Sequence, residues 1–174
     1  MWQFFFGIGR VSADGGHKVL LLGDSLTLSG WADYISYDHT VVAKRSQNTD
    51  WVLSQLDSLI ASGEINQYDT AVVWIGVNNP YLAVEGIPEI YGILHSYGIK
   101  VVGVTQYLHR YGKPSDDVLR KILEYSEIVR SQADEVVDLA VNPTIVDSKG
   151  FVRPDVAPDG LHPSSTVMAQ LIAS

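Results

Sequence analysis

The sequence predicts a single α/β domain in which a parallel sheet lies between two layers of helices. Four short apolar runs, rich in leucine or β-branched residues, are continuous rather than alternating, which is typical of strands buried on both faces. They cover Val19 to Leu22, Thr70 to Ile75, Val101 to Val104 and Val136 to Leu139. A weaker fifth strand is expected at residues 39–44. Because helical patterns separate these runs, we expect a three-layer α/β/α fold with five parallel strands.

Three segments between the strands carry apolar side chains at helical spacing. They run from Trp51 to Ile60, from Ile87 to Leu94 and from Val118 to Ile128. Gly98 follows the second segment as a C-terminal cap. The third opens with Ser115-Asp116-Asp117, and acidic residues in a first turn suit the helix dipole. One domain of this kind accounts for a chain of 174 residues.

The composition excludes several classes of function. The chain has 12 basic and 20 acidic residues, giving a formal net charge of −8. Nucleic-acid grooves and proteins that bind anionic membranes need a basic surface, so neither is expected. The sequence contains no cysteine, which rules out disulfides, thiolate catalysis and cysteine-based zinc sites.

The N-terminus is interpreted as an arm over residues 1–16, preceding a single domain over 17–174. The arm begins with the apolar stretch Met1 to Gly7 but lacks a basic start, so a signal peptide is not expected. No run reaches the roughly 18 apolar residues of a membrane span. The arm either packs on the domain or anchors the chain to a partner or a second subunit. The default location is cytoplasmic, with release or incorporation into a viral particle left open.

A candidate nucleophile follows the first strand. Ser25 lies in Gly23-Asp24-Ser25-Leu26, at the edge of the sheet where ligands of parallel α/β folds bind. A serine at a strand-to-helix turn presents its hydroxyl to that crevice, and free backbone N–H groups there can meet an oxyanion. The alternative is that Asp24 or Ser25 is only a helix N-cap. The glycine-flanked G-x-S-x-G elbow is absent, which disfavours an ordinary α/β-hydrolase.

A candidate acid–base pair lies near the C-terminus, in Asp159-Gly160-Leu161-His162. An Asp three residues before a His can bond one ring nitrogen while the other faces outward, as a general base requires. The alternative is a loop Asp beside a solvent-exposed His. Asp155 is a rival for the acid role, and its spacing of seven residues makes it the weaker candidate.

A candidate oxyanion donor follows the third strand, in Gly76-Val77-Asn78-Asn79. The Asn78 amide is a neutral donor suited to an oxyanion hole, and glycine at position 76 allows close backbone approach. The alternative is an asparagine in a turn before Pro80. Together the three segments supply a nucleophile, an oxyanion donor and an acid–base pair, so no catalytic part is missing.

These motifs resemble those of the SGNH, or GDSL, hydrolases over nearly the whole chain, from about His17 to Ser174. The matching blocks are Gly23 to Leu26, Gly76 to Asn78 and Asp159 to His162. The resemblance implies a flavodoxin-like fold and a Ser25 nucleophile that also donates its backbone N–H. It implies that Asn78 donates its amide, that His162 is the base with Asp159 as its partner, and that Gly23, Asp24, Gly76 and Asn79 support the site.

Two positions depart from the family pattern. Ser46 stands where the second block normally presents a glycine N–H to the oxyanion. That donor survives the exchange if φ stays negative, and the pocket becomes narrower and more polar. Asn79 replaces the usual Asp after the third-block Asn, which removes a charge beside the oxyanion donor and has a modest expected effect.

The expected activity is that of a carboxylesterase for short acyl groups, such as a carbohydrate O-deacetylase, working through an acyl-enzyme. No metal or organic cofactor is expected, because the remaining histidines lie in unrelated segments. The expected substrate rim comprises Tyr81, Gln106, Tyr107 and His109, with ordinary loop packing as the alternative. Rival functions are a thioesterase or lysophospholipase of the same family, and a non-catalytic module of a larger assembly, such as a viral one, that associates through the arm.

Overall fold

The computed structural model describes residues 18–172, and the predicted N-terminal arm lies outside them. Five parallel strands form one sheet in the order β2-β1-β3-β4-β5. The strands are β1 (Val19–Gly23), β2 (His39–Ala43), β3 (Thr70–Trp74), β4 (Lys100–Val104) and β5 (Glu135–Val137). The predicted parallel five-stranded sheet is therefore confirmed.

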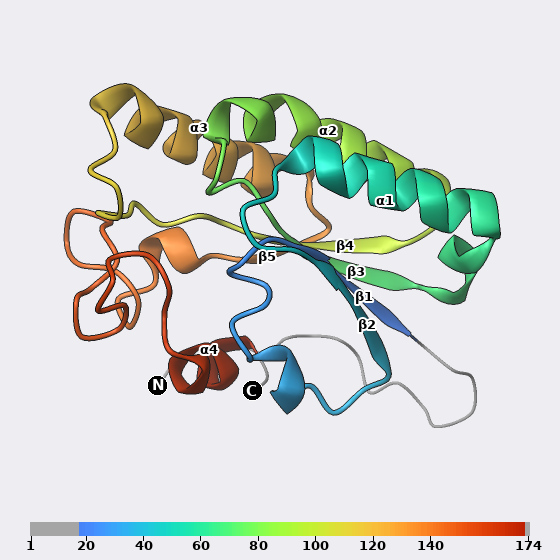
Figure 1. Cartoon of the computed structure of the whole chain (residues 1–174), viewed down its shortest axis with the longest axis horizontal. Coiled ribbons are helices and arrows are strands. Elements are labelled where there is room, and N and C mark those ends of the chain that lie inside the picture. The colour runs from blue at the N-terminus through green and yellow to red at the C-terminus, as the bar shows by residue number, and fades with distance from the viewer. Residues whose placement is uncertain (1–17, 173–174) are drawn as a thin grey trace.

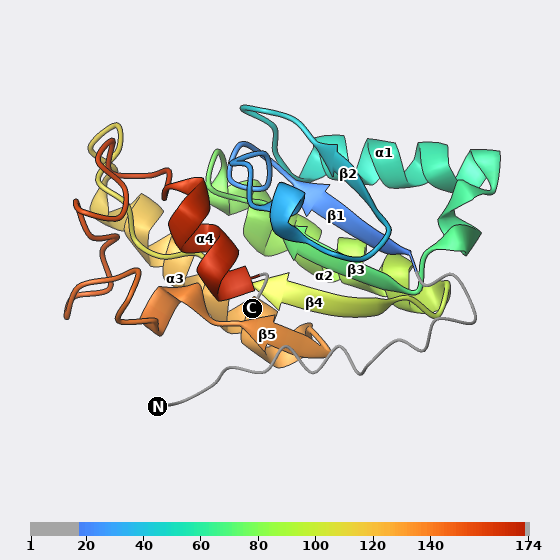
Figure 2. The same cartoon turned by 90° about the horizontal axis from the view of Figure 1, so that it is seen from below.

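Helices cover both faces of this sheet, as Figure 1 shows. The long helices α1, α2 and α3 lie on one face, whereas the short α4 and the 3₁₀ turn η1 lie on the other. The bounds are α1 (Thr49–Ser62), α2 (Pro80–Ser96), α3 (Asp116–Gln132), α4 (Ser165–Ile172), η1 (Ala32–Tyr34), η2 (Glu64–Gln67) and η3 (Leu139–Val141). The three-layer α/β/α architecture is confirmed, with one layer thinner than the other (Figure 2).

Side-chain caps fix where the long helices begin. The side chains of Asn48, Asn79 and Ser115 each accept a hydrogen bond from a backbone N–H in the first turn of α1, α2 and α3. Such caps satisfy donors that have no partner within the helix. At the end of α2, Gly98 has φ 70° and donates its N–H to the carbonyl of His95. The predicted glycine cap is thus present.

The two faces of the sheet bury separate apolar clusters because successive strand residues point to opposite sides. In β1, Leu20 and Leu22 pack toward α1, α2 and α3, whereas Val19 and Leu21 pack with residues of the thinner layer. All five residues of β1 and of β3 are buried. These two central strands therefore form a rigid base for the turns that follow them.

The strand order reverses at β1, and this places two predicted motifs side by side. From β1 the chain first adds β2 on one side and then β3 on the other. Gly23 at the end of β1 is level with Ala43 of β2 and with Trp74 of β3. Ligands of open parallel sheets bind beyond the strand ends at such a reversal. The turns after β1 and β3, which contain Ser25 and Asn78, meet at this point.

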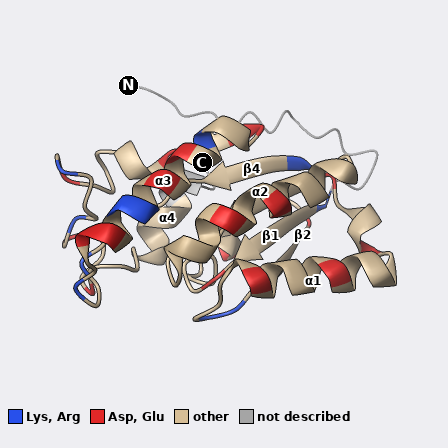
Figure 3. Ribbon diagram, turned by 90° about the horizontal axis from the view of Figure 1, so that it is seen from above, with Lys and Arg blue, Asp and Glu red and all other residues tan. Residues whose placement is uncertain are grey.

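The charge distribution follows the acidic composition. Figure 3 marks acidic residues along α1 and α2, and neither helix contains a Lys or Arg. The surfaces of α1 and α2 therefore lack the basic groups that phosphate backbones require. None of the helices within residues 18–172 has the length and apolar character needed to cross a membrane.

Candidate active site

Ser25 lies in a compact turn after β1 and not at the start of a regular helix, which corrects one detail of the sequence-based expectation. The Asp24 carboxylate accepts a hydrogen bond from the N–H of Leu26 over 2.9 Å, and the Leu28 N–H donates to the carbonyl of Asp24 over 3.2 Å. Asp24 therefore caps a turn of the Asx type. The indole of Trp31 donates to the Leu26 carbonyl and closes the turn from inside.

The structure brings Ser25, His162 and Asp159 into one hydrogen-bonded chain. Ser25 Oγ lies 3.0 Å from His162 Nε2, although the residues are 137 positions apart. His162 Nδ1 lies 2.6 Å from Asp159 Oδ2. This is the arrangement in which an imidazole takes a proton from a hydroxyl while a carboxylate fixes its tautomer. Ser25 is 8% exposed, so its hydroxyl is shielded but reachable.

Asp159 is held in its orientation by the backbone of its own turn. Its Oδ1 accepts hydrogen bonds from the N–H groups of Leu161 over 2.9 Å and of His162 over 2.8 Å. Partial burial opposes the charge, but the hydrogen bonds from the His162 ring and from these two N–H groups outweigh it and lower the pKa of Asp159. The rival Asp155 instead pairs with Arg153 over 2.6 Å.

Asp24 is the buried charge of the site. It is fully buried, and its Oδ2 accepts hydrogen bonds from the Gly76 N–H over 3.4 Å and from the Asn78 amide over 3.3 Å. Burial raises the pKa of this carboxyl to about 6, against the lowering effect of the N–H groups of Leu26 and Gly76 and of the nearby His162. Asp24 thus joins the turn of Ser25 to the turn of Asn78.

The side-chain amide of Asn78 is fully engaged in this structure. Its Nδ2 donates to Asp24 and also, over 3.0 Å, to the backbone carbonyl of Gln47. An amide nitrogen has two hydrogens. Donation to an oxyanion therefore requires one of these two hydrogen bonds to break, so that the freed amide hydrogen can bond to the substrate oxygen.

Ser46 adopts a left-handed backbone conformation with φ 59°, so the negative φ on which its expected role depends is wrong. Only glycine adopts this region without steric cost, which is the physical reason for a glycine at this place in the related motif. Ser46 nevertheless precedes Gln47, whose carbonyl contacts Asn78, so its segment reaches the site. Within residues 18–172 the backbone N–H groups of Ser25 and Ser46 have no hydrogen-bond partner. The positive φ therefore does not engage the Ser46 N–H elsewhere, and both N–H groups are available to an oxyanion.

Two residues of the expected substrate rim are buried and form the floor of the site, which corrects that expectation. The Tyr107 hydroxyl donates to the Leu161 carbonyl over 2.7 Å, and the ring packs edge-on against Trp74. Gln106 accepts a hydrogen bond from the Trp74 indole over 3.0 Å. Both side chains are satisfied inside the protein, so they support the His162 loop and do not meet solvent.

The two remaining rim candidates lie in different environments. Tyr81, in the first turn of α2, is exposed, and its hydroxyl bonds to Asp117 at the start of α3. His109 is buried, and neither of its ring nitrogens has a hydrogen-bond partner among residues 18–172. Burial lowers the pKa of His109, and the nearby backbone of Tyr111 opposes this effect. Only Tyr81 therefore stays available as a rim residue.

Tyr111 also borders the candidate site. It ends the segment from Gln106 to Tyr111 that the sequence predicts at the substrate rim, although it is not among the four residues expected there. Its ring lies edge-on to the ring of His162, with centroids 6.4 Å apart and planes at 72°. It is 56% exposed, so it borders the site from the solvent side. An aromatic residue before a glycine in the loop after a strand was the available signal, but this pattern is common in loops.

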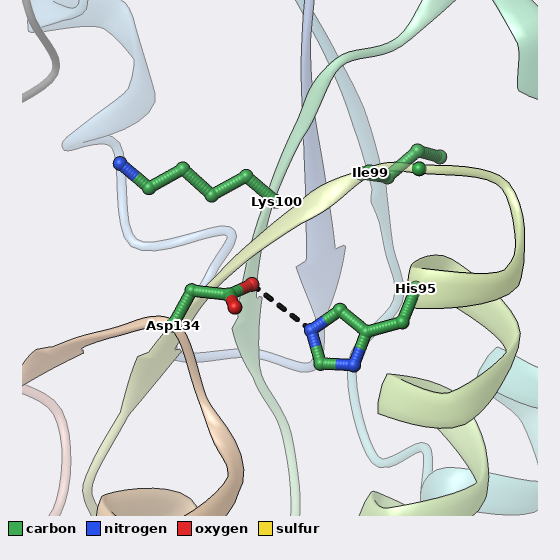
Figure 4. Close-up of a pocket in the computed structure, with 5 residues that line it drawn as sticks. His95, Ile99, Lys100 and Asp134 are labelled. Atoms are coloured by element: carbon green, nitrogen blue, oxygen red, sulfur yellow. Dashed lines mark hydrogen bonds and ion pairs between the residues drawn. The ribbon is translucent and has the colours of Figure 1, made fainter.

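A pocket of about 410 Å³ lies at the opposite end of the sheet, where β4 begins. Figure 4 shows His95, Ile99, Lys100 and Asp134 around it, with the imidazole directed at the carboxylate. Asp134 accepts hydrogen bonds from His95 Nε2 over 2.9 Å and from the Val101 N–H over 2.7 Å. No hydroxyl or thiol lines this pocket, so it offers no serine, threonine or cysteine nucleophile. Its polar groups join the end of α2 to β4 and β5.

No arrangement of three or more His, Asp or Glu side chains suited to a metal ion occurs in the described part of the chain. The reacting groups of the candidate site are a hydroxyl, an imidazole and a carboxylate, with backbone and amide donors beside them. This set is suited to acyl transfer, in which a serine attacks a carbonyl carbon and N–H groups hold the oxyanion.

Comparison with solved structures identifies the class of fold. A GDSL-like lipase from Bacteroides thetaiotaomicron superimposes with a TM-score of 0.74 at 17% identity, covering 90% of this chain and 86% of the other. A putative acylhydrolase from Bacteroides fragilis gives 0.72 at 21% identity over 89% and 84% of the two chains. An acetyl xylan esterase from Geobacillus stearothermophilus gives 0.67 at 15% identity over 90% and 93%. No protein-family model and no curated relative matches the sequence.

The chain therefore has the fold of the SGNH/GDSL hydrolases, and the expected resemblance is confirmed at the level of the fold. The similarity extends over most of each compared chain.

Proposed function

We propose that this protein is a serine ester hydrolase that forms an acyl-enzyme on Ser25. The observation that carries the proposal is the hydrogen-bonded chain from Ser25 Oγ through His162 to Asp159, with distances of 3.0 and 2.6 Å. The shared fold with GDSL-like lipases, acylhydrolases and acetyl xylan esterases supports the same reaction class.

The first half of the reaction acylates the enzyme. His162 Nε2 takes the proton of Ser25 as Oγ attacks the carbonyl carbon, and Asp159 stabilises the imidazolium that forms. The carbonyl oxygen becomes an oxyanion held by the N–H groups of Ser25 and Ser46 and by the Asn78 amide. The tetrahedral intermediate collapses, the bond to the alcohol oxygen breaks, and His162 gives its proton to the leaving alcohol.

The second half releases the acid. A water molecule gives a proton to His162 and attacks the acyl carbon, and the oxyanion forms again at the same donors. When the intermediate collapses, Ser25 leaves as an alkoxide and recovers its proton from His162. The products are a carboxylic acid and an alcohol.

We further propose a short acyl group on a carbohydrate as the substrate. The exposed ring of Tyr111 borders the candidate site and offers both an apolar face and a hydroxyl. Such a surface suits a sugar that carries an acetyl ester. Two of the structural neighbours are acetyl xylan esterases.

Labelling with a fluorophosphonate tests the reaction class. We expect an adduct at Ser25 in the wild type and none in Ser25→Ala. Ser29→Ala is the matched control, because Ser29 lies in the same turn and its hydroxyl bonds only to the Leu26 carbonyl. An unlabelled wild type would contradict the proposal and favour a non-catalytic module.

A substrate panel tests the acyl and alcohol parts separately. Nitrophenyl acetate, butyrate and octanoate vary the acyl chain, acetylated xylo-oligosaccharides vary the alcohol, and an acyl-coenzyme A replaces oxygen by sulfur. We expect the highest kcat/KM with acetyl esters. A preference for octanoate or for the thioester would instead indicate a lysophospholipase or thioesterase.

A further inference from the structure

Tyr111 is held beside the candidate active site by a tight turn. The Lys113 N–H donates to the Arg110 carbonyl over 3.3 Å, and the left-handed φ angles of Gly112 (68°) and Lys113 (52°) allow the chain to reverse there. Tyr111 occupies the first corner of this turn, which directs its ring outward. Its hydroxyl has no hydrogen-bond partner within residues 18–172.

The turn is tied to the loop that carries the acid–base pair. The Arg110 N–H donates to the Gly160 carbonyl over 3.1 Å, and Gly160 lies between Asp159 and His162 in the sequence. A side chain at Gly160 would come within 3.4 Å of the Tyr111 nitrogen. The two loops are therefore in contact along their backbones, and the position of Tyr111 depends on the same turn as that of His162.

The side chain of Arg110 anchors the turn on its other side. Its guanidinium donates to the Val152 carbonyl and to Asp147, each over 2.8 Å, and lies 4.5 Å from the ring centroid of Phe151. These three contacts bind the guanidinium of Arg110 within the protein. The group that the turn presents to a substrate is therefore the neutral ring of Tyr111.

The chemistry of the reaction determines which part of the substrate meets this ring. His162 must protonate the leaving alcohol, so the alcohol oxygen comes within hydrogen-bond reach of Nε2. The oxyanion lies instead toward Asn78 and Ser46. Below the site, Gln106 and Tyr107 close the floor, so the bulk of the alcohol extends outward past His162. The exposed aromatic residue in contact with His162 is Tyr111.

We propose that Tyr111 is a specificity residue that binds the leaving alcohol, and that this alcohol is a sugar ring packed against the tyrosine with a hydroxyl near its phenol. This inference rests on the proposed function and deepens it. The ring of a pyranose has an apolar face formed by C–H groups and a rim of hydroxyls. A rigid tyrosine with a free hydroxyl complements both features at small entropic cost.

Paired substrates with one acyl group and two alcohols test the proposal. For an acetylated methyl xyloside, we expect Tyr111→Ala to raise KM by about three- to ten-fold, with kcat little changed, as for loss of one aromatic contact. For ethyl acetate, whose alcohol has no ring, we expect little change in either constant. Tyr111→Phe keeps the ring and should restore most of the loss. Tyr34→Ala is the matched control, since Tyr34 is also 56% exposed but lies on η1.

Binding to an inactive variant separates this inference from the proposed function. Saturation-transfer NMR with the acetylated methyl xyloside is measured on Ser25→Ala, with and without Tyr111→Ala. We expect the sugar signals to weaken when the ring is removed. Equal losses for both esters, or unchanged sugar binding without the ring, would overturn the role of Tyr111. An inactive wild type that still binds the sugar through Tyr111 would overturn only the hydrolase proposal.

Discussion

The side-chain amide of Asn78 donates a hydrogen bond to the buried carboxylate of Asp24 over 3.3 Å, although 54 positions separate the two residues in the sequence. The contact joins the turn after β1 to the turn after β3. The same amide reaches the Gln47 carbonyl in the segment after β2. Three adjacent strand ends are thus linked through one asparagine, which fixes the relative positions of the groups proposed to hold the oxyanion.

The substitution Asp24→Asn is expected to change how stability depends on pH. Burial raises the pKa of Asp24 from 3.8 to about 6, so folding favours the protonated carboxyl. The stability that this gives is fully present below pH 3.8 and is lost as the pH rises through about 6. The asparagine side chain of the variant does not titrate. The free energy of unfolding of the variant relative to wild type should therefore rise by about 3 kcal/mol from pH 3.5 to 7.5. Urea titrations at several pH values measure this difference, and a difference independent of pH would contradict it.

Asn78→Ala is expected to lower ester turnover by roughly a hundred-fold or more, because one oxyanion donor is lost. Stability should fall by about 2–4 kcal/mol, because two hydrogen bonds are lost and one of them is to the buried Asp24 carboxylate. Asn79→Ala is the matched control. It removes the N-cap of α2, which accepts from the Leu82 N–H, and should cost about 1 kcal/mol of stability while leaving turnover nearly intact. Near-wild-type turnover of Asn78→Ala would remove this residue from the oxyanion hole.

The layers and strands could be predicted because their signal is local. Runs such as those of β1 and β3 are short and apolar without interruption, and this pattern together with β-branched residues favours a strand buried on both faces. The motifs at Ser25 and Asn78 could be placed on one edge because parallel strands end together, whereas the motif of Asp159 and His162 lies in the final loop. The observed strand bounds differ from the predicted ones by one or two residues, because the ends of an element are frayed and are its least sharply defined part.

The environment of each loop side chain could not be predicted, because it depends on distant partners. Gln106 and Tyr107 have polar groups that suit a rim, yet Trp74 and the Leu161 carbonyl satisfy them inside the protein. The turn at Ser25 is closed by the indole of Trp31, which no local pattern reveals. The prominence of Tyr111 likewise depends on the contact between Arg110 and Gly160.

Substitutions at Ser46 test the strained backbone in the second motif. A φ of 59° costs an L-residue about 1–2 kcal/mol, and a β-branched residue more. Ser46→Val should therefore lower both the free energy of unfolding and turnover. Ser46→Gly should keep turnover at or above that of wild type, because the backbone N–H stays in place. Its free energy of unfolding should rise by less than the ~1–2 kcal/mol of relieved strain, because glycine also gains conformational freedom in the unfolded chain. Denaturation and acetate hydrolysis measure the pair, and a valine variant as stable as wild type would contradict the left-handed conformation.

Gly23→Ala tests whether the end of β1 must lack a side chain for Ser25 to be placed. A methyl group there would lie 1.9 Å from Thr27 Oγ1 and 2.4 Å from the backbone carbonyl oxygen of Trp74. The Thr27 hydroxyl already donates to that carbonyl, and β3 is fixed by pairing on both sides, so neither atom has room to yield. We expect the free energy of unfolding to fall by at least about 1–3 kcal/mol, the usual cost of overpacking, and turnover to fall because the Ser25 turn must shift.

Gly92→Ala in α2 is the control. Its methyl group would meet nothing within 4 Å, and the substitution should raise stability by up to about 1 kcal/mol through helix propensity. Equal denaturation midpoints for the two variants would show that β1 and β3 do not approach each other as closely as this.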